Sequence, residues 1–227
     1  MRRDKAIGDA GFAILPAFFS HEHLDQLLHE IDESAPRRSR AGIRHALSLS
    51  PVAALAREPQ MIELAREVLG PEAFPFRAAF FDKSPTANWL VVWHQDTALP
   101  LRERIDRLGW GPWSIKDRID YAHAPATALS QVLALRVSCD DSIAGNGPLR
   151  VLPGTHTLGV LSDDNLRDFS TRIAAVDCVA PKGGVVAMRP LVVHASAKSQ
   201  NEMPRRVLHI EYAASESFVK PLQLAVA

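Results

Sequence analysis

Cysteine is scarce in this chain, which holds only Cys139 and Cys178 in 227 residues. The two lie far apart and form no CxxC pair, so neither a disulfide framework nor a zinc ribbon is indicated. Buried free thiols in a cytoplasmic protein are the simplest interpretation. An excess of one charge is also missing, because 26 Lys and Arg residues balance 26 Asp and Glu residues. A balanced chain has no general field to hold a polyanion, so we expect no nucleic-acid partner.

Long apolar runs are missing as well. No stretch approaches the ~20 apolar residues of a membrane span, and we expect no membrane partner. The N-terminal segment has a basic tip and a short apolar stretch, but Asp4 and Asp9 interrupt it and no small-residue cleavage site follows. We therefore interpret it as mature protein. The chain also has no GxGxxG motif, Walker loop or internal repeat, which disfavours nucleotide-binding folds and repeat architectures.

The first part of the chain shows helical patterns. Ser20 is placed to cap an amphipathic helix with its leucines on one stripe. Residues 34–42 form a polar, basic loop, and residues 50–70 contain two helical pieces divided at Pro59. Residues 1–70 are therefore predicted to be mainly helical.

The pattern changes to short strands from residue 74 on. β-branched and aromatic runs bounded by Pro, Gly, Asn or Asp occur at 74–83, 88–96, 128–139, 148–154, 173–181, 183–194 and 204–214. One helix interrupts them at 162–172, with Ser162 as its N-cap. Many short strands after a helical prefix predict a mainly β fold with flanking helices, either a sandwich or a barrel. We expect one domain over residues 1–227, with its β core at 74–214.

A long segment, 97–126, carries Trp110, Trp113, Tyr121 and several prolines. A structureless loop of this length is uncommon in a compact domain and often serves as a lid or a binding loop. A loop that wraps the core and packs its tryptophans on it is the structural alternative. Trp110 and Trp113 are therefore candidates for contact with a partly apolar substrate.

The motif NWLVVWHQD places a histidine and an acid two positions apart at the end of a strand-forming run. On a strand, residues i and i+2 face the same way, so His94 and Asp96 present an imidazole and a carboxylate from one face. They supply two ligands of the facial triad of non-haem Fe(II) enzymes, which needs one more histidine and leaves positions open. Alone, the pair is weak evidence because HxD recurs by chance.

His194 is the candidate for the third ligand. It ends the apolar run VVAMRPLVVH, with several predicted strands between it and Asp96. That separation is expected if two distant strands meet across a barrel. The other histidines lie on the first helix, in or beside loops, or on a strand whose face is not fixed: His21, His23, His29, His45, His123, His156 and His209.

Arg205 comes eleven residues after His194. A guanidinium pairs bidentately with a carboxylate, which a lysine cannot mimic. An arginine beside a strand-borne metal site could anchor a co-substrate with two carboxylates, one on the metal and one on the guanidinium. Ser196 could add a hydroxyl to the same carboxylate. A surface salt bridge is the ordinary alternative for any single arginine, and Arg206 competes for the role.

Together these motifs resemble the phytanoyl-CoA dioxygenase family of Fe(II)/2-oxoglutarate oxygenases. The resemblance covers most of the chain and rests on DAGFAILPAFFS, FFDKSPTANWLVVWHQD, NGPLRVLPGTH and GGVVAMRPLVVHASAKSQNEMPRRVLHIEY. It implies a double-stranded β-helix (jelly-roll, cupin-like) core with His94, Asp96 and His194 as iron ligands. It also implies that Arg205, assisted by Ser196, anchors the distal carboxylate of 2-oxoglutarate.

Three further positions are expected near the same site. The resemblance places Lys83 near the co-substrate, because it precedes the metal strand in FFDKSP. It places Arg136 on a strand that lines the pocket in relatives, and Ser138 would face the same side. A buried arginine needs a partner, which favours contact of Arg136 with substrate or co-substrate if it points inward.

The activity implied by the resemblance is that of a 2-oxoglutarate-dependent non-haem iron dioxygenase, with Fe(II), 2-oxoglutarate and O₂. It would hydroxylate an unactivated C–H bond of a small molecule and release succinate and CO₂. Related halogenases replace the carboxylate ligand with a small residue, so Asp96 favours hydroxylation, while desaturation and ring chemistry stay open. Two alternatives remain, a cupin-like metal-dependent enzyme that does not use 2-oxoglutarate and a non-catalytic small-molecule binding protein on the same fold.

Overall fold

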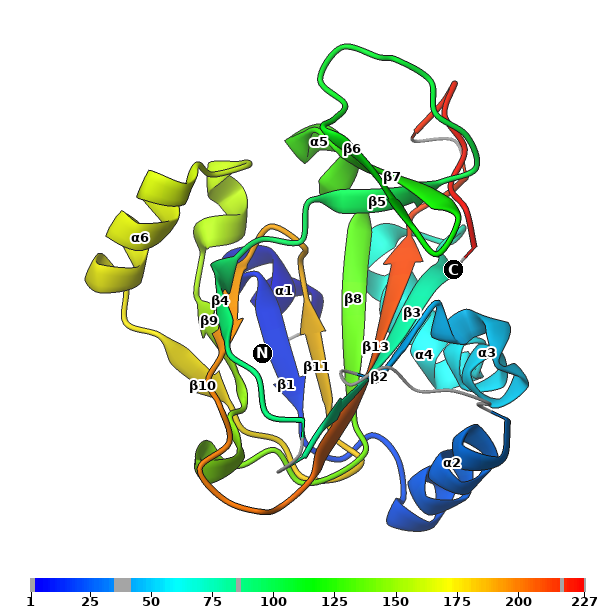
Figure 1. Ribbon diagram of the computed structural model, residues 1–227, viewed down its shortest axis with the longest axis vertical. Helices are drawn as coiled ribbons and strands as arrows, with labels where there is room; N and C mark the ends of the chain where they lie inside the picture. The colour runs from blue at the N-terminus through cyan, green and yellow to red at the C-terminus, as the bar shows by residue number, and fades with distance from the viewer. Residues whose placement is uncertain (1–2, 35–41, 85–86, 217–218, 227) are drawn as a thin grey trace.

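Two β-sheets form the body of the computed structural model, which describes residues 3–34, 42–84, 87–216 and 219–226 (Figure 1). The larger sheet has the strand order β1-β11-β8-β13-β3-β2 and the smaller one β10-β9-β12-β4. Side chains from the larger sheet (Ala134, Val186, Met188) and from the smaller sheet (Leu149, Val151, Cys178) share one buried cluster. The sheets therefore face each other, as the predicted mainly β fold with flanking helices requires.

The strands of the larger sheet are β1 (Phe12–Leu15), β2 (Gly42–Arg44), β3 (Phe74–Lys83), β8 (Val132–Ser138), β11 (Val185–Met188) and β13 (Arg205–Ala213). Those of the smaller sheet are β4 (Val91–His94), β9 (Leu149–Leu152), β10 (Val176–Cys178) and β12 (Val193–Ser196). A third sheet has the order β5-β7-β6, with β5 (Ala98–Leu101), β6 (Trp113–Lys116) and β7 (Ile119–His123). The α-helices are α1 (Arg3–Ala10), α2 (His21–Ser34), α3 (Ser50–Ala56), α4 (Pro59–Leu69), α5 (Ala126–Leu129) and α6 (Asp163–Arg172).

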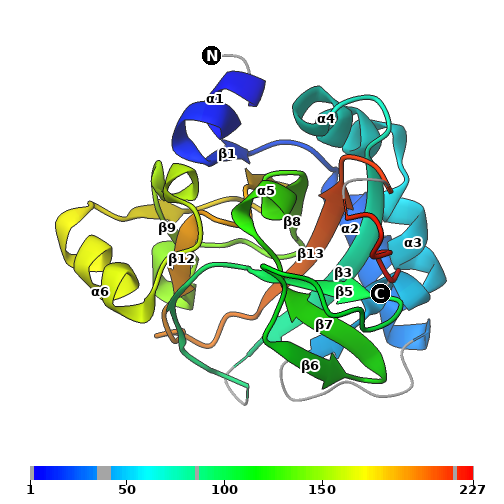
Figure 2. The same ribbon diagram turned by 90° about the horizontal axis from the view of Figure 1, so that it is seen from above.

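Helices α2, α3 and α4 lie along the outer face of the larger sheet (Figures 1 and 2). The apolar stripe of α2 and outward side chains of the sheet such as Phe80 and Leu208 belong to one core cluster. Ser20 caps α2 by accepting from the backbone N–H of His23 at 3.2 Å. Burying one leucine side chain stabilises a fold by about 1.5–3 kcal/mol, so this cluster holds the helices firmly against the outer face of the sheet. The inner face is left for the side chains of the site. The loop predicted at 34–42 lies almost entirely outside the described residues.

One predicted strand run is divided in the structure. Residues 183–194 hold both β11 and the start of β12, which belong to different sheets. Between them Arg189 donates its backbone N–H to Gly11 at 2.8 Å, and Pro190 has no N–H to give to a ladder. The chain therefore crosses from the larger sheet to the smaller one at this point and delivers His194 to β12.

The segment 97–126 is not the irregular loop that its composition predicts. It contains the three-stranded sheet β5-β7-β6, drawn above the two large sheets in Figure 1. Strands β6 and β7 are joined by a two-residue turn, Asp117-Arg118, in which both residues have positive φ (49° and 68°). This is the backbone of a type I′ hairpin, whose usual Asn-Gly or Asp-Gly signal is absent here. The composition of the segment gives no indication of the hairpin for that reason.

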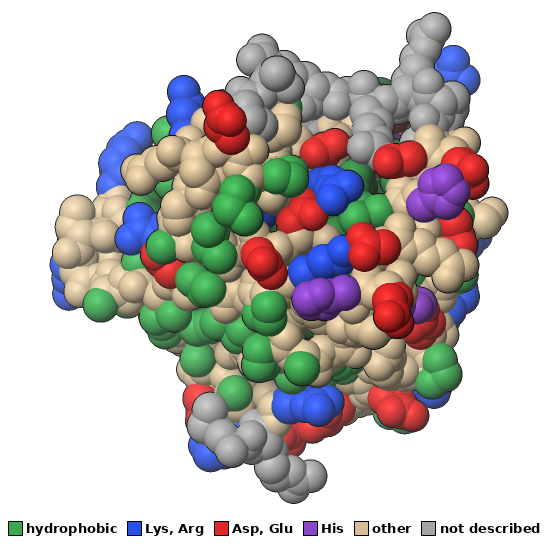
Figure 3. Space-filling model, turned by 90° about the horizontal axis from the view of Figure 1, so that it is seen from below, with side chains coloured by type: hydrophobic (Ala, Val, Ile, Leu, Met, Phe, Trp, Pro, Cys, Tyr) green, Lys and Arg blue, Asp and Glu red, His purple; other side chains and the backbone are tan. Residues whose placement is uncertain are grey.

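The surface matches the balanced composition. On the face shown in Figure 3, basic and acidic side chains lie next to one another rather than separating by sign. Both cysteines are buried and free, as predicted. Within the described part of the chain, no helix combines the length and apolarity that crossing a bilayer requires.

Candidate metal centre and co-substrate site

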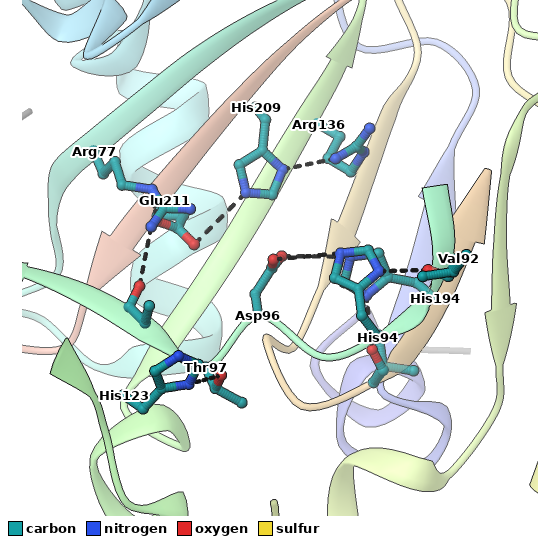
Figure 4. A network of polar contacts seen from close by, with 12 residues as sticks. Arg77, Val92, His94, Asp96, Thr97, His123, Arg136, His194, His209 and Glu211 are labelled. Carbon is teal, nitrogen blue, oxygen red and sulfur yellow. Dashed lines mark hydrogen bonds and ion pairs between the residues drawn. The ribbon is translucent and has the colours of Figure 1, made fainter. Parts of the chain in front are cut away.

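His94, Asp96 and His194 meet where β4 pairs with β12. The two strands are antiparallel, His94 stands directly opposite His194, and their ring centroids are 4.1 Å apart. Figure 4 shows both rings directed toward the carboxylate of Asp96, which follows β4. Nε2 of His94 lies 3.8 Å from Oδ1 of Asp96, and Nε2 of His194 lies 3.5 Å from Oδ2. One donor atom from each residue lies within 4.8 Å of the other two, so the three predicted residues do come together.

Backbone carbonyls determine which ring nitrogen is free. Nδ1 of His94 lies 2.8 Å from the carbonyl oxygen of Val92, and Nδ1 of His194 lies 2.9 Å from that of Val192. A carbonyl only accepts, so each ring carries its proton on Nδ1 and turns the lone pair of Nε2 toward Asp96. Two imidazole nitrogens and one carboxylate oxygen form the donor set that suits non-haem Fe(II), so these residues fit that ion.

Burial and charge hold His194 and Asp96 in the protonation states that a metal needs. Burial, opposed by the charge of Asp96, lowers the pKa of His194 to about 4, which leaves the ring neutral at neutral pH. Burial alone would raise the pKa of Asp96. The surrounding histidines and Arg77 act in the opposite sense and hold that pKa below its ordinary value. The carboxylate of Asp96 is therefore ionised, and both it and Nε2 of His194 offer a lone pair.

Gln95 connects the two segments that carry these residues. Its side-chain amide donates to the carbonyl oxygens of Gly159 (2.9 Å) and Leu191 (2.7 Å), and its oxygen accepts from the N–H of Leu161 (2.8 Å). The backbone N–H of Asp96 also donates to the carbonyl of residue 190 at 2.9 Å. The HQD segment is thus fastened to the chain that leads into His194, which the HxD pattern alone does not reveal.

A second cluster is formed by Ser196, two residues beyond His194 on β12, together with Lys83 of β3 and Arg205 of β13. The Oγ atom of Ser196 is 3.1 Å from Nζ of Lys83 and 3.2 Å from Nη2 of Arg205. Lys83 and Arg205 are cross-strand partners on β3 and β13. Lys83 also donates to the carbonyl of Ala197 at 2.7 Å. The structure thus brings Arg205 and Ser196, the residues expected at the distal carboxylate of 2-oxoglutarate, together with Lys83, which was expected near the co-substrate.

Positive charge accumulates in this cluster without an acid. No carboxylate among the described residues pairs with Lys83, Arg136 or Arg205. Burial, and then the nearby Arg205 and Arg136, lowers the pKa of Lys83 to about 8. Burial, and then Arg136, lowers the pKa of Arg205 to about 10. Buried cations are costly unless they are paired, so this part of the interior favours a bound anion.

Arg206, the competitor of Arg205, has a different environment. It donates from Nε and Nη2 to the two carboxylate oxygens of Asp140, at 2.8 and 2.7 Å. Successive residues of β13 point to opposite faces, so Arg205 enters the interior and Arg206 faces away from it. Of these two arginines, Arg205 is the one placed to bind a carboxylate between the sheets.

A buried polar network that no sequence motif indicated extends from Arg136 across β13. Nη1 of Arg136 lies 2.9 Å from Nδ1 of His209. Arginine can only donate, so Nε2 of His209 carries the ring proton and faces Glu211, whose Oε1 is 3.6 Å away. Nε of Arg77 lies 2.6 Å from Oε2 of Glu211, and its Nη1 donates to the carbonyl of Ala98 at 3.1 Å. If Arg205 faces the space between the sheets, strand alternation makes residues 207, 209 and 211 face it too. This alternation is the sequence signal from which His209 and Glu211 could have been found.

The network also contains a second group of possible metal donors. Atoms of Asp96, His209 and Glu211 lie within 4.8 Å of one another. However, Arg77 already engages Glu211, and Arg136 already engages Nδ1 of His209. Two adjacent guanidinium groups repel a cation, so the trio of His94, Asp96 and His194 is the better metal site.

The remaining predicted site residues are Ser138, Trp110 and Trp113. Ser138 is buried on β8, two residues beyond Arg136 and on the same face. Trp110 and Trp113 pack, partly buried, against a separate cluster formed by β5, β7, α5 and the C-terminal segment. Tyr121, from the same insert, instead lines a pocket with Arg77 beside β3.

A model of the family described as "Phytanoyl-CoA dioxygenase (PhyH)" matches residues 7–207. The chain belongs to the phytanoyl-CoA dioxygenase family. The same family was indicated by the HxD motif, the distal histidine and the arginine that follows it. Its members are 2-oxoglutarate-dependent non-haem iron dioxygenases.

The L-proline trans-4-hydroxylase of Streptomyces griseoviridis is 23% identical over an alignment of 186 residues, and the match covers 70% of this chain and 62% of that protein. The chain thus spans less than two thirds of the length of this relative. The carbocyclase SnoK from nogalamycin biosynthesis matches with a TM-score of 0.70 at 13% identity, over 99% of this chain and 86% of its own. Apo EctD from S. alaskensis matches with a TM-score of 0.68 at 21% identity, over 93% and 76%. These likenesses confirm the cupin-like jelly-roll fold.

Proposed function

We propose that this chain is an Fe(II)- and 2-oxoglutarate-dependent oxygenase that hydroxylates an unactivated C–H bond of a small molecule. The observation that carries the proposal is the position of two sites relative to each other. His194, one member of a two-histidine, one-carboxylate donor set, lies two residues before Ser196 on β12, and the hydroxyl of Ser196 contacts two buried cations that lack an acid. A dicarboxylate with one end at the metal and the other at Arg205 satisfies both sites.

Each residue has a defined task in this proposal. His94 and His194 present Nε2 to the iron, because their Nδ1 protons are held by backbone carbonyls. Asp96 supplies the anionic ligand. Arg205 and Lys83 hold the distal carboxylate of 2-oxoglutarate through hydrogen bonds to a charged group, worth about 1.5–3 kcal/mol each. When iron and 2-oxoglutarate are bound, they supply the oxidative decarboxylation by O₂ that yields succinate and CO₂ and oxidises the substrate.

Hydroxylation is favoured over the other outcomes of this chemistry by two observations. Asp96 keeps a carboxylate in the donor set. The relative from Streptomyces griseoviridis is a hydroxylase that acts on L-proline, and EctD from S. alaskensis has been solved with 2-oxoglutarate and 5-hydroxyectoine. A small molecule is therefore the expected partner.

An anaerobic absorbance titration tests the proposal without knowledge of the substrate. Fe(II) and 2-oxoglutarate added to the wild-type protein should give a visible metal-to-ligand charge-transfer band. The band should be lost in His194→Ala, and a much higher 2-oxoglutarate concentration should be needed in Arg205→Ala. Arg206→Ala, which removes the neighbouring guanidinium, is the matched control and should behave as the wild type does.

The same titration separates the alternatives. A metal-dependent enzyme that does not use 2-oxoglutarate would bind Fe(II) but give no band, and Arg205→Ala would leave its metal affinity and its activity intact. A band equally sensitive to Arg205→Ala and Arg206→Ala would also contradict the assignment of the anion site. With O₂ admitted, succinate release across amino acids, acyl thioesters and small metabolites identifies the substrate, with Asp96→Ala as the blank.

A further inference from the structure

A pocket of about 180 Å³ opens beside β2 and β3, and none of the predicted site residues lines it. Its walls include Arg44, Arg77 and Phe81 from the sheet, and Lys116 and Tyr121 from the β6–β7 hairpin. Arg77 and Phe81 alternate along β3 with residues 78 and 80, which belong to the hydrophobic cluster behind the sheet. Residues 78 and 80 also line the pocket, and through Arg77 and Phe81 it reaches the inner face of the larger sheet, the face that carries the polar network described above.

The pocket is connected to the metal centre through Arg77. This arginine pairs with Glu211, and Glu211 has an oxygen within 4.8 Å of donor atoms of His209 and Asp96. Burial lowers the pKa of Lys116 and the nearby Arg77 and Arg44 lower it further, while the charge of Asp96 acts in the opposite sense. The metal-binding carboxylate is thus close enough for its field to reach both cations at the pocket. Figure 4 shows Arg77 and Glu211 on one side of Asp96 and the two candidate ligand histidines on the other.

The charges around the pocket do not balance. Arg77 has Glu211 as its partner at 2.6 Å, and Arg44 has Asp117 at 3.3 Å. Lys116 has no acidic partner within the part of the chain that the structure describes, and its Nζ lies 4.8 Å from the centroid of the Tyr121 ring. One positive charge therefore remains uncompensated at this position.

Tyr121 gives the pocket a fixed aromatic wall. Its side chain is almost fully buried, its hydroxyl lies 2.9 Å from Nε2 of His45, and the guanidinium of Arg77 lies 5.9 Å from its ring centroid. Burial lowers the pKa of His45, so this histidine is neutral at neutral pH and adds no charge. The pocket thus combines one unpaired ammonium group with aromatic surfaces from Tyr121 and Phe81.

We infer that this pocket is the substrate subsite of the proposed oxygenase and that it takes a small carboxylate, anchored by Lys116 and packed against Tyr121. One uncompensated charge matches a monoanion rather than a dianionic phosphate. A cavity of roughly 150 Å³ holds a benzene molecule, so a pocket of about 180 Å³ has room for the ring of a small ring acid. Because the subsite assignment rests on the proposed function, its test must separate the two.

The test uses protein loaded anaerobically with Fe(II) and 2-oxoglutarate, whose charge-transfer band shifts when a molecule binds beside the metal. The probes are L-proline, benzoate and cyclohexanecarboxylate, each compared with its own carboxamide. At least one carboxylate should bind about tenfold or more tightly than its amide, because the amide lacks the charge that Lys116 binds. Lys116→Gln should remove this difference and leave the 2-oxoglutarate affinity unchanged. Arg118→Gln, an equal loss of charge in the adjoining turn, should retain the difference.

Three results would overturn the subsite. They are equal binding of the acids and their amides, an acid preference that survives Lys116→Gln, and the lack of saturable binding by any of the three acids up to about 10 mM. In all of them the charge-transfer band still forms, so the proposed function stands. If no band forms before a probe is added, the proposed function fails and the subsite fails with it.

Discussion

At the scale of the residue, short backbone contacts fix the state of the chemical groups. His94 and His194 use the same local device, a hydrogen bond from Nδ1 to the carbonyl two residues earlier, at Val92 and Val192. The strand therefore orients each ring before any metal arrives, which reduces the reorganisation that binding would otherwise require. Lys83 is different, because both charged groups that shift its pKa, Arg205 and Arg136, are cations, and its protonation state therefore depends on whether an anion binds.

The lowered pKa of Lys83 predicts a pH dependence of 2-oxoglutarate binding. Burial, Arg205 and Arg136 lower this pKa to about 8, so in the ligand-free protein Lys83 loses its charge as pH rises through about 8. Affinity should therefore be highest below pH 8 and fall between pH 7 and pH 9. The ionisation of 2-oxoglutarate itself does not change in this range. Calorimetric titration of Mn(II)-loaded protein with 2-oxoglutarate at several pH values measures the effect.

Lys83→Gln should bind 2-oxoglutarate about tenfold more weakly at pH 7, the equivalent of one hydrogen bond to a charged group, and should lose the pH dependence. Arg205 stays charged over this range because its pKa is about 10. Arg205→Gln should therefore weaken binding but keep the slope. A wild-type affinity that does not change between pH 7 and pH 9 would contradict the role of Lys83.

At the scale of the element, the sequence predicts what alternation and composition encode and misses what depends on turns and pairing. A strand within residues 88–96 and the helix capped by Ser162 were predictable because strand-forming composition and caps are local signals, although the observed strand covers only Val91–His94. The β6–β7 hairpin was not, because Asp117-Arg118 is an unusual type I′ turn. The directly opposed positions of His94 and His194 depend on strand register, which no local pattern determines.

The side chain of Gln95 links two such elements, and its loss should affect the metal site. In Gln95→Leu, the carbonyls of Gly159 and Leu191 and the N–H of Leu161 lose their partner. An unsatisfied buried group costs about 1–3 kcal/mol, and only the bond to Leu191 is fully buried, so the free energy of unfolding should fall by about 1–3 kcal/mol. Because the segment that carries His94 and Asp96 is then no longer fastened to residue 191, Mn(II) affinity should fall by about tenfold or more, a typical loss for groups that support metal ligands.

Denaturant titration and Mn(II) binding followed by electron paramagnetic resonance measure these two effects in the same samples. Gln60→Leu, a change of the same kind at an exposed position, should alter neither. A Gln95→Leu protein that is less stable but binds Mn(II) as tightly as the wild type would restrict Gln95 to a structural role.

At the scale of the whole molecule, the two histidines proposed as metal ligands and the two cations proposed to bind the anion belong to different sheets. His94 and His194 lie on the smaller sheet, and Lys83 and Arg205 lie on the larger one. In the proposed function, 2-oxoglutarate spans the space between them, with one end at the metal and the other at the guanidinium. Its binding should therefore connect the two sheets, whereas the metal alone holds β4 to β12 within one sheet.

This bridge predicts that 2-oxoglutarate stabilises the fold strongly only when a metal is present. A ligand at 100 times its Kd adds about 2.7 kcal/mol to the free energy of unfolding. For a chain of this length, that should raise Tm by about 5–10 °C.

His194→Ala should lose the Tm shifts caused by Mn(II) and by 2-oxoglutarate, while Arg205→Met should keep the Mn(II) shift and lose the 2-oxoglutarate shift. Arg206→Met should start from a lower Tm, because Asp140 loses its partner, yet show both shifts. Equal 2-oxoglutarate shifts with and without Mn(II), measured by calorimetric melting, would show that the ligand does not bridge the sheets through the metal.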